Sequence, residues 1–210
     1  MQKVLKISLI MIGLIFLVAC SSRTTNENET MVEAEIMIVS GDFPHYTNIE
    51  HLASNASEVV RVEVLSERVE AINIWLPPQN EFEDTGEVLR EAYFIYTIHQ
   101  LRILEVFKGD VNVGDILEVK QIGGQLDGLT VINDDKISFG AGDDLVLFLQ
   151  SFDDVPASLL NPDQSAYRFT ISNEDARNRN IDDALESLSM QNNLTLTLND
   201  LASILASNND

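Results

Sequence analysis

Hydrophobic and polar residues alternate with a period of two through most of the middle of this chain, as they do in β-strands with one buried face. The alternation predicts strands at residues 58–65, 68–75, 91–107, 116–122, 129–132, 136–139, 145–152 and 167–171. Segment 145–152 differs because it starts with five consecutive apolar residues and lies between two aspartate pairs. We therefore expect it to be a central strand that is buried on both faces.

The longest strand signal, at residues 91–107, does not keep one phase. Its apolar positions change parity between Ile98 and Leu101 and again before Val106. Such a change predicts a β-bulge, which occurs where a sheet bends into a barrel. Together with the glycine turns between the shorter strands, the pattern predicts a mainly β (β+α) protein built on a small, bent antiparallel β-barrel.

Helical spacing precedes the strands. Residues 46–56 predict a short N-terminal helix, with Thr47 as the expected N-cap. The residues expected to face inward are Ile49, Leu52 and Ala53. Residues 31–39 alternate only in part and fit either an edge strand or a short helix.

After residue 172 the chain becomes polar and helical in pattern, which predicts a C-terminal helical appendage over 173–210. One amphipathic helix is expected at 182–190. Its expected inward residues are Ala184, Leu185 and Leu188. A second helix is expected to open at Thr197, because Thr197 and Asp200 resemble a capping box with Asp in place of Glu. Its apolar face would hold Leu198, Leu201, Ile204 and Leu205.

The N-terminus has the pattern of a secretion signal. Lys3 and Lys6 precede an uncharged run at 7–18, whose 12 residues are too few for a membrane-spanning helix of roughly 17–25 residues. The run ends in LVAC at 17–20, which resembles the lipobox of bacterial lipoproteins. The alternative is an uncleaved N-terminal membrane helix with an incidental cysteine.

The lipobox resemblance implies a signal peptide at 1–19 that is cut between Ala19 and Cys20, with a diacylglycerol thioether on Cys20. Two acyl chains give a stable anchor, since each buried methylene contributes about 0.8 kcal/mol. The implied product is anchored by its lipid to the extracytoplasmic side of a bacterial cell membrane. Residues 20–42 would form a flexible tether, and no cofactor is expected besides the lipid.

A second resemblance concerns the strands. VFKG at 106–109, GD at 114–115 and GDDLVLF at 142–148 resemble the netrin/tissue-inhibitor-of-metalloproteinase type of OB-fold, and still more a broad set of uncharacterised secreted bacterial proteins with that layout. The resemblance covers about residues 58–171 and implies an OB-like barrel domain at 43–172. In the inhibitors a free N-terminal cysteine reaches the protease zinc, whereas Cys20 lies far upstream and has no partner cysteine. Protease inhibition is therefore not expected.

Composition narrows the function classes. The chain has 13 Lys and Arg against 34 Asp and Glu, for a net charge of −21 that becomes −23 once residues 1–19 are removed. This charge excludes a nucleic-acid partner, because such proteins neutralise phosphates with basic residues. The single cysteine excludes an internal disulfide framework and a cysteine-rich metal cluster.

Acidic pairs occur at 134–135, 143–144, 153–154 and 182–183. Adjacent strand residues point to opposite faces, so a pair is not a chelate. We therefore expect solvated strand ends and no Ca²⁺ site. His45 and His51 enclose an H-x₄-E-H spacing, which is too long for the H-x-x-E-H zinc motif, and His99 stands alone. No metal site is predicted.

The glycines form no phosphate-binding motif. Gly123, Gly124 and Gly128 are instead expected to provide positive φ or close strand crossing. No spacing indicates a Ser/His/Asp group, so no catalytic residue is predicted.

An aromatic binding face is the remaining candidate. The aromatics considered are Trp75, Tyr93, Phe94 and Tyr96, and Trp75 is the one expected to be exposed. The sequence thus predicts a non-catalytic binding or envelope-associated module with a protein, peptide or glycan ligand. The alternative is a lipoprotein hydrolase whose site assembles only in three dimensions.

Overall fold

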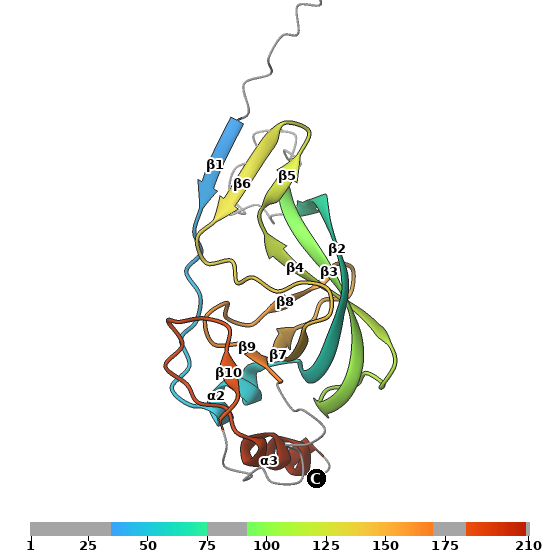
Figure 1. Cartoon of the computed structure of the whole chain (residues 1–210), viewed down its shortest axis with the longest axis vertical. Coiled ribbons are helices and arrows are strands. Elements are labelled where there is room, and N and C mark those ends of the chain that lie inside the picture. Colours follow the sequence, from blue (N-terminus) through green and yellow to red (C-terminus); the bar gives the residue numbers. More distant parts are fainter. Residues whose placement is uncertain (1–34, 75–91, 170–183, 209–210) are drawn as a thin grey trace, which may run out of the picture. The chain divides into compact units, whose positions relative to one another are not determined.

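A computed structural model of the chain describes residues 35–74, 92–169 and 184–208 (Figure 1). The chain is mainly β, as predicted. Its elements are β1 (Glu35–Val39), α2 (Ile49–Asn55), β2 (Glu58–Ile74), β3 (Ala92–Lys108), β4 (Ile116–Ile122), β5 (Gly124–Leu126), β6 (Leu129–Asn133), β7 (Asp144–Gln150), β8 (Ala157–Leu159), β9 (Ala166–Arg168), β10 (Glu186–Ser187) and α3 (Leu198–Asn208). Cys20, Ala19, Trp75 and the 182–183 acidic pair lie outside the described residues.

The larger sheet closes on itself. Its strand order is β10-β9-β7-β2-β3-β4-β8, and β8 pairs back onto β7, so β2, β3, β4, β8 and β7 form a ring (Figure 1). A separate sheet has the order β1-β6-β5. The expected purely antiparallel pairing was wrong, because β4–β8 and β1–β6 are parallel.

The two longest strands carry the predicted irregularities. The β2–β3 register skips Leu65 on β2 and both Leu104 and Phe107 on β3, so the bulges belong to both strands. The two strand signals at 58–65 and 68–75 therefore join into one continuous β2. The bulges also let β3 serve two cores: Leu101 and Ile103 face one and Phe107 faces the other.

Two clusters of buried side chains lie on opposite faces of β7. Leu145, Leu147 and Leu149 belong to the cluster inside the ring, here called the ring core. Val146 and Phe148 belong to a second cluster formed with α2 and α3, here called the helix core. All five side chains are fully buried, which confirms the expected two-sided central strand.

The helical predictions have mixed outcomes. Helix α2 begins after Asn48, whose side chain accepts from the His51 N–H at 2.7 Å, so the N-cap is Asn48 and not Thr47. Helix α3 has the predicted capping box: Asp200 Oδ2 accepts from the Thr197 N–H at 2.8 Å, and the Asp200 N–H donates to Thr197 Oγ1 at 3.2 Å. Leu201 is buried and Leu205 is exposed.

Residues 184–190 are not helical, contrary to prediction. Glu186 and Ser187 pair with β9, and the Leu185 N–H donates to the Leu196 carbonyl at 2.7 Å, so strand pairing takes precedence over the helical spacing. Ala184 is exposed, whereas Leu185 is buried in the helix core. Because Leu185, Leu196 and Leu201 all belong to that core, the C-terminal segment is part of the fold and not an appendage.

One expected strand is absent from the described part of the chain. Residues 136–139 form no ladder, although Ile137 and Phe139 are buried in the ring core as alternation would place them. The segment thus fills the ring without extending a sheet.

Candidate functional site

The Asp143–Asp144 pair is ion-paired and not simply solvated. Arg61 holds Asp144 with two bonds of 2.9 and 2.7 Å and also covers the Phe169 ring at 3.8 Å from its centroid. Arg168 contacts Asp143. Burial alone raises the pKa of Asp143, but bonds from the Gly140 N–H and Arg168 outweigh it and lower that pKa. The two carboxylates therefore hold arginines, and the expectation of solvated strand ends was wrong here.

His99 is a deeply buried ionisable side chain, at 1% exposed. It lies on the inner face of β3 with its ring centroid 4.3 Å from that of Phe139. Its Nε2 lies 3.1 Å from Gln121 Nε2, while Nδ1 lies 3.7 Å from Glu67 Oε2 and has no hydrogen-bond partner in the described part of the chain. Burial lowers the pKa of His99 to about 4, so the ring is neutral at pH 7.

The histidines do not assemble a nucleophile–base pair within the described residues. His45 meets Gln164, His51 packs edge-on against Tyr46 and His99 meets Gln121. Two of these contacts are with glutamine amides and the third is between the rings of His51 and Tyr46, so none is a hydrogen bond to a serine or threonine hydroxyl. Ser151 does contact a carboxylate, that of the buried Glu58, but no histidine joins them. The described geometry therefore contains no Ser–His arrangement at hydrogen-bond distance.

Glycines at the β4–β5 junction have the predicted structural use. Gly123 and Gly124 have φ of 116° and 141°, and Gly128 has 86°. A Cβ on Gly124 would lie 2.8 Å from Val69 Cγ1, so the glycine permits β5 to cross close over β2. These positions are explained by backbone geometry alone.

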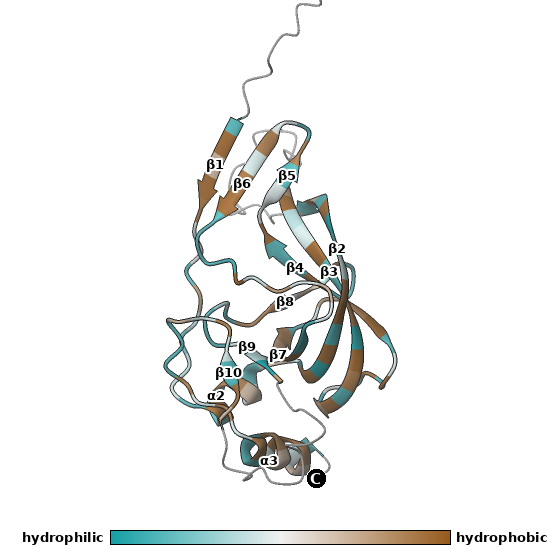
Figure 2. Cartoon of the chain, in the orientation of Figure 1, coloured by the Kyte–Doolittle hydropathy of each residue, from teal (hydrophilic) through white to brown (hydrophobic). Residues whose placement is uncertain are grey.

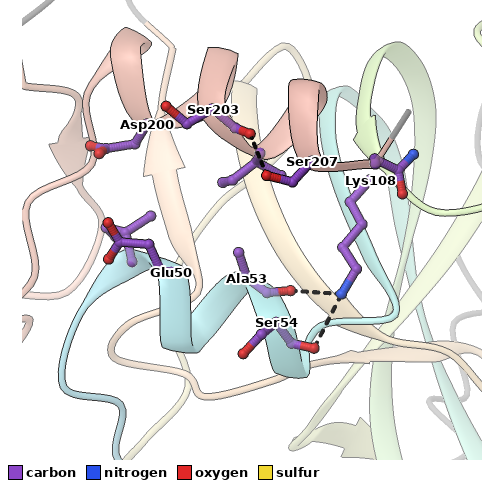
Figure 3. Close-up of a pocket in the computed structure, with 10 residues that line it drawn as sticks. Glu50, Ala53, Ser54, Lys108, Asp200, Ser203 and Ser207 are labelled. Atoms are coloured by element: carbon purple, nitrogen blue, oxygen red, sulfur yellow. Dashed lines mark hydrogen bonds between the residues drawn. The ribbon is translucent and has the colours of Figure 1, made fainter. Parts of the chain in front are cut away.

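A pocket of about 300 Å³ lies between α2 and α3 (Figure 3). The positively charged side chain in its wall is that of Lys108. Its Nζ donates to the carbonyls of Ala53 at 2.8 Å, Ser54 at 3.2 Å and Ala56 at 2.7 Å. These three bonds use all the donors of an ammonium group and cap the C-terminus of α2. Asp200, also on the wall, caps α3. Lys108 and Asp200 are thus occupied by the fold, and Glu50 on α2 is the other charged group that lines the pocket.

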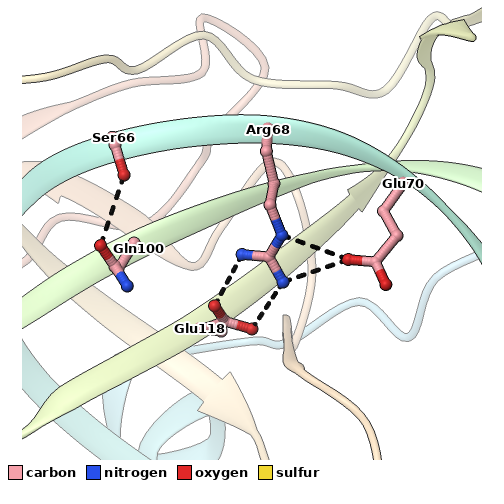
Figure 4. A network of polar contacts seen from close by, with 5 residues as sticks. All are labelled: Ser66, Arg68, Glu70, Gln100 and Glu118. Atoms are coloured by element: carbon pink, nitrogen blue, oxygen red, sulfur yellow. Dashed lines mark hydrogen bonds and ion pairs between the residues drawn. The ribbon is translucent and has the colours of Figure 1, made fainter.

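The outer face of the ring carries a polar network (Figure 4). Arg68 on β2 reaches past β3 to Glu118 on β4 with bonds of 2.6 and 2.9 Å, and it also meets Glu70 at 3.2 Å. Hydrogen bonding to Glu118 raises the pKa of Arg68, and Arg68 lowers the pKa of Glu118. These groups are about half exposed and already paired with one another, so they form a solvated face.

The β1 edge surface, defined as Ile36, Ile38 and Ile132, is a group of apolar side chains that the fold leaves exposed. Ile36 is 63% exposed, Ile38 68% and Ile132 43%. Ile38 and Ile132 are paired in register, so the three side chains share one face of the small sheet. Figure 2 shows the resulting hydrophobic stretch along β1. Exposed apolar side chains grouped on a sheet are typical of an interaction site.

The backbone of β1 is also open on one side. Glu35 donates to the Gly128 carbonyl at 3.2 Å and Val39 accepts from the Asp134 N–H at 3.4 Å, so the odd-numbered residues of β1 bond to β6. Because backbone groups alternate in direction along a strand, the N–H and C=O of Ile36 and Ile38 face the opposite side. Within the described residues no strand pairs with that side.

The structure does not bring the described residues of the predicted aromatic face, Tyr93, Phe94 and Tyr96, onto one exposed surface. Tyr93 and Phe94 are exposed at the start of β3, but as neighbours on a strand they point to opposite faces, and Tyr96 is buried. Of the two alternatives for residues 31–39, the strand is the one present at Glu35–Val39. Sequence reasoning did not single out Ile36 and Ile38; the available signal was four consecutive apolar residues, at 36–39, in a segment that alternates only in part.

Searches against protein-family models and against curated proteins each found no match for this chain. Among the described residues no helix is both long and apolar enough to cross a bilayer. Nor do the described histidines and acidic residues form a group of three or more suited to a metal ion.

Proposed function

We propose that this protein is a lipid-anchored, extracytoplasmic binding module with an OB-like barrel, which acts by holding another macromolecule and not by catalysis. The observation that carries the proposal is the β1 edge surface, where exposed isoleucines coincide with a strand edge that no described strand pairs with. Cys20 would carry the diacylglycerol, as the lipobox resemblance implies. The five-stranded ring supports the OB-like assignment, since that fold is a five-stranded barrel.

The anchor is tested by replacing Cys20 with Ser and fractionating cells. We expect the unaltered chain in the membrane fraction at mature length, and the Cys20→Ser chain either released or retained as uncleaved precursor. A Cys20→Ser chain that still partitions with membranes at mature length would overturn the anchor.

Binding is tested by placing a photo-crosslinking amino acid at Ile36 or, as a matched control, at the fully exposed Met190. We expect a defined partner crosslinked from position 36 and not from position 190, with the crosslink lost in an Ile38→Asp background. Equal crosslinking from both positions would overturn the edge surface as the binding site.

A further inference from the structure

From the same edge, and resting on the proposed function, we propose that the partner supplies an extended cationic segment that adds to β1 as a further strand. Such a segment would have apolar residues in its centre and a Lys or Arg at each end. The argument uses three features of the edge: its backbone groups, its side chains and the charges at its ends.

The backbone gives the mode of binding. Ile36 and Ile38 each direct one N–H and one C=O toward the open side, so an added strand meets two donors and two acceptors at alternate positions. The same two residues carry the most exposed apolar side chains of β1. A partner with apolar side chains at alternate positions would therefore satisfy backbone and side chains together.

The charges give the chemistry of the partner. Glu35 and Asp127 lie at one end of β1, where the Glu35 N–H bonds to Gly128; Asp134 lies at the other, where its N–H bonds to Val39. All three carboxylates belong to exposed residues and none forms an ion pair within the described residues. Four strand steps separate the two ends, about 13 Å. Basic residues four apart in an extended segment match this spacing.

The same charges disfavour a second copy of the chain as occupant. Two β1 edges that pair in either direction bring acidic ends against acidic ends, in a protein whose net charge is −21. A cationic segment instead has opposite charge near both ends, whichever direction it runs: Glu35 lies on β1 itself, and Asp127 and Asp134 lie on its β6 side, one strand spacing of about 4.8 Å further away.

The test uses the full chain purified from membranes in detergent and a fluorescent, end-blocked peptide of sequence Lys-Val-Thr-Val-Lys. We expect saturable binding by fluorescence anisotropy, at least about tenfold weaker for the same peptide with Glu in place of Lys. Binding should weaken about as much in the triple variant Glu35→Gln, Asp127→Asn, Asp134→Asn. Raising NaCl well above about 0.1 M should weaken it as well, because exposed charges are then screened.

Strand addition has its own signature. Ile38→Pro removes an outward N–H while leaving the bonds of β1 to β6 in place, so we expect loss of binding with unchanged thermal unfolding. Peptides N-methylated on one set of alternate residues should lose binding, whereas methylation of the other set should not. Equal affinity for both sets, or full binding by Ile38→Pro, would overturn the inference.

The two proposals fail differently. If crosslinking from Ile36 captures a partner but no cationic peptide binds, the proposed function stands and the strand-addition inference is overturned. Sedimentation of the chain as a dimer that Ile38→Pro dissociates would identify a second copy as occupant and overturn it too. If neither crosslink nor peptide binding occurs, both are overturned.

Discussion

The unfolding free energy of this protein should depend on pH through His99. In an unfolded chain the pKa of a histidine is about 6.5, whereas burial lowers that of folded His99 to about 4. Between these values the folded state binds fewer protons than the unfolded state. The unfolding free energy therefore has its full value, as far as His99 is concerned, above about pH 6.5. It falls progressively as the pH is lowered to about 4.

At about 1.4 kcal/mol for each pH unit, the loss amounts to about 3 kcal/mol at pH 4. Little of this is screened, because the side chain is 1% exposed. The cause is burial of the imidazole ring, to which the charge of Lys136 adds, while Glu67, with Oε2 3.7 Å from Nδ1, offsets part of the cost.

Urea unfolding at a series of pH values, for the unaltered chain and for His99→Gln, measures the effect. The substitution also changes packing against Phe139, but that offset is the same at every pH and cancels in the comparison of slopes. We expect the unaltered chain to lose about 2–3 kcal/mol more than the variant between pH 7 and pH 4.5. Identical slopes for the unaltered chain and His99→Gln would refute the reasoning.

Further outcomes follow from the other contacts, all measured by urea or thermal unfolding. In a double-mutant cycle of Arg61→Ala and Asp144→Asn we expect a coupling of about 1–2 kcal/mol, because the pair is bidentate and part-buried; additive losses would contradict this. Thr197→Ala should cost about 1 kcal/mol by removing the α3 cap. Glu118→Gln should cost under about 0.5 kcal/mol despite its short bonds to Arg68, since both groups are about half exposed; a larger loss would show a structural role. Ca²⁺ and Mg²⁺ should raise the melting temperature equally by screening the net charge, and a saturable, Ca²⁺-selective rise would reveal a built site.

Local signals in the sequence predicted local structure well. The capping box at Thr197 involves residues three apart, and the five consecutive apolar residues at 145–149 by themselves indicate a strand buried on both faces. Neither signal needs distant residues to be recognised. The parity changes in 91–107 likewise predicted bulges. They did not show that Leu65 on the partner strand is one of the skipped residues, because a bulge is a property of a strand pair.

Signals that depend on distant partners misled or were silent. Residues 184–190 have helical spacing but are extended, because β9 and the Leu196 carbonyl provide their hydrogen bonds. The parallel pairing of β1 with β6 joins residues almost a hundred positions apart. Without that pairing Ile36 and Ile38 have no assigned face, so the candidate site was not visible in the sequence.

The helix core has a consequence for how the protein is made. It unites Tyr46 and Leu52 from near the start of the fold with Leu196 and Leu201 from near its end. The ribosome delivers these residues in order, so the helix core on the outward face of β7 is completed only when almost the whole chain has emerged. Contacts this distant in sequence are closed slowly. The helix core would therefore stay incomplete for as long as the last residues were withheld, whereas the buried residues of the ring core are all delivered by residue 166.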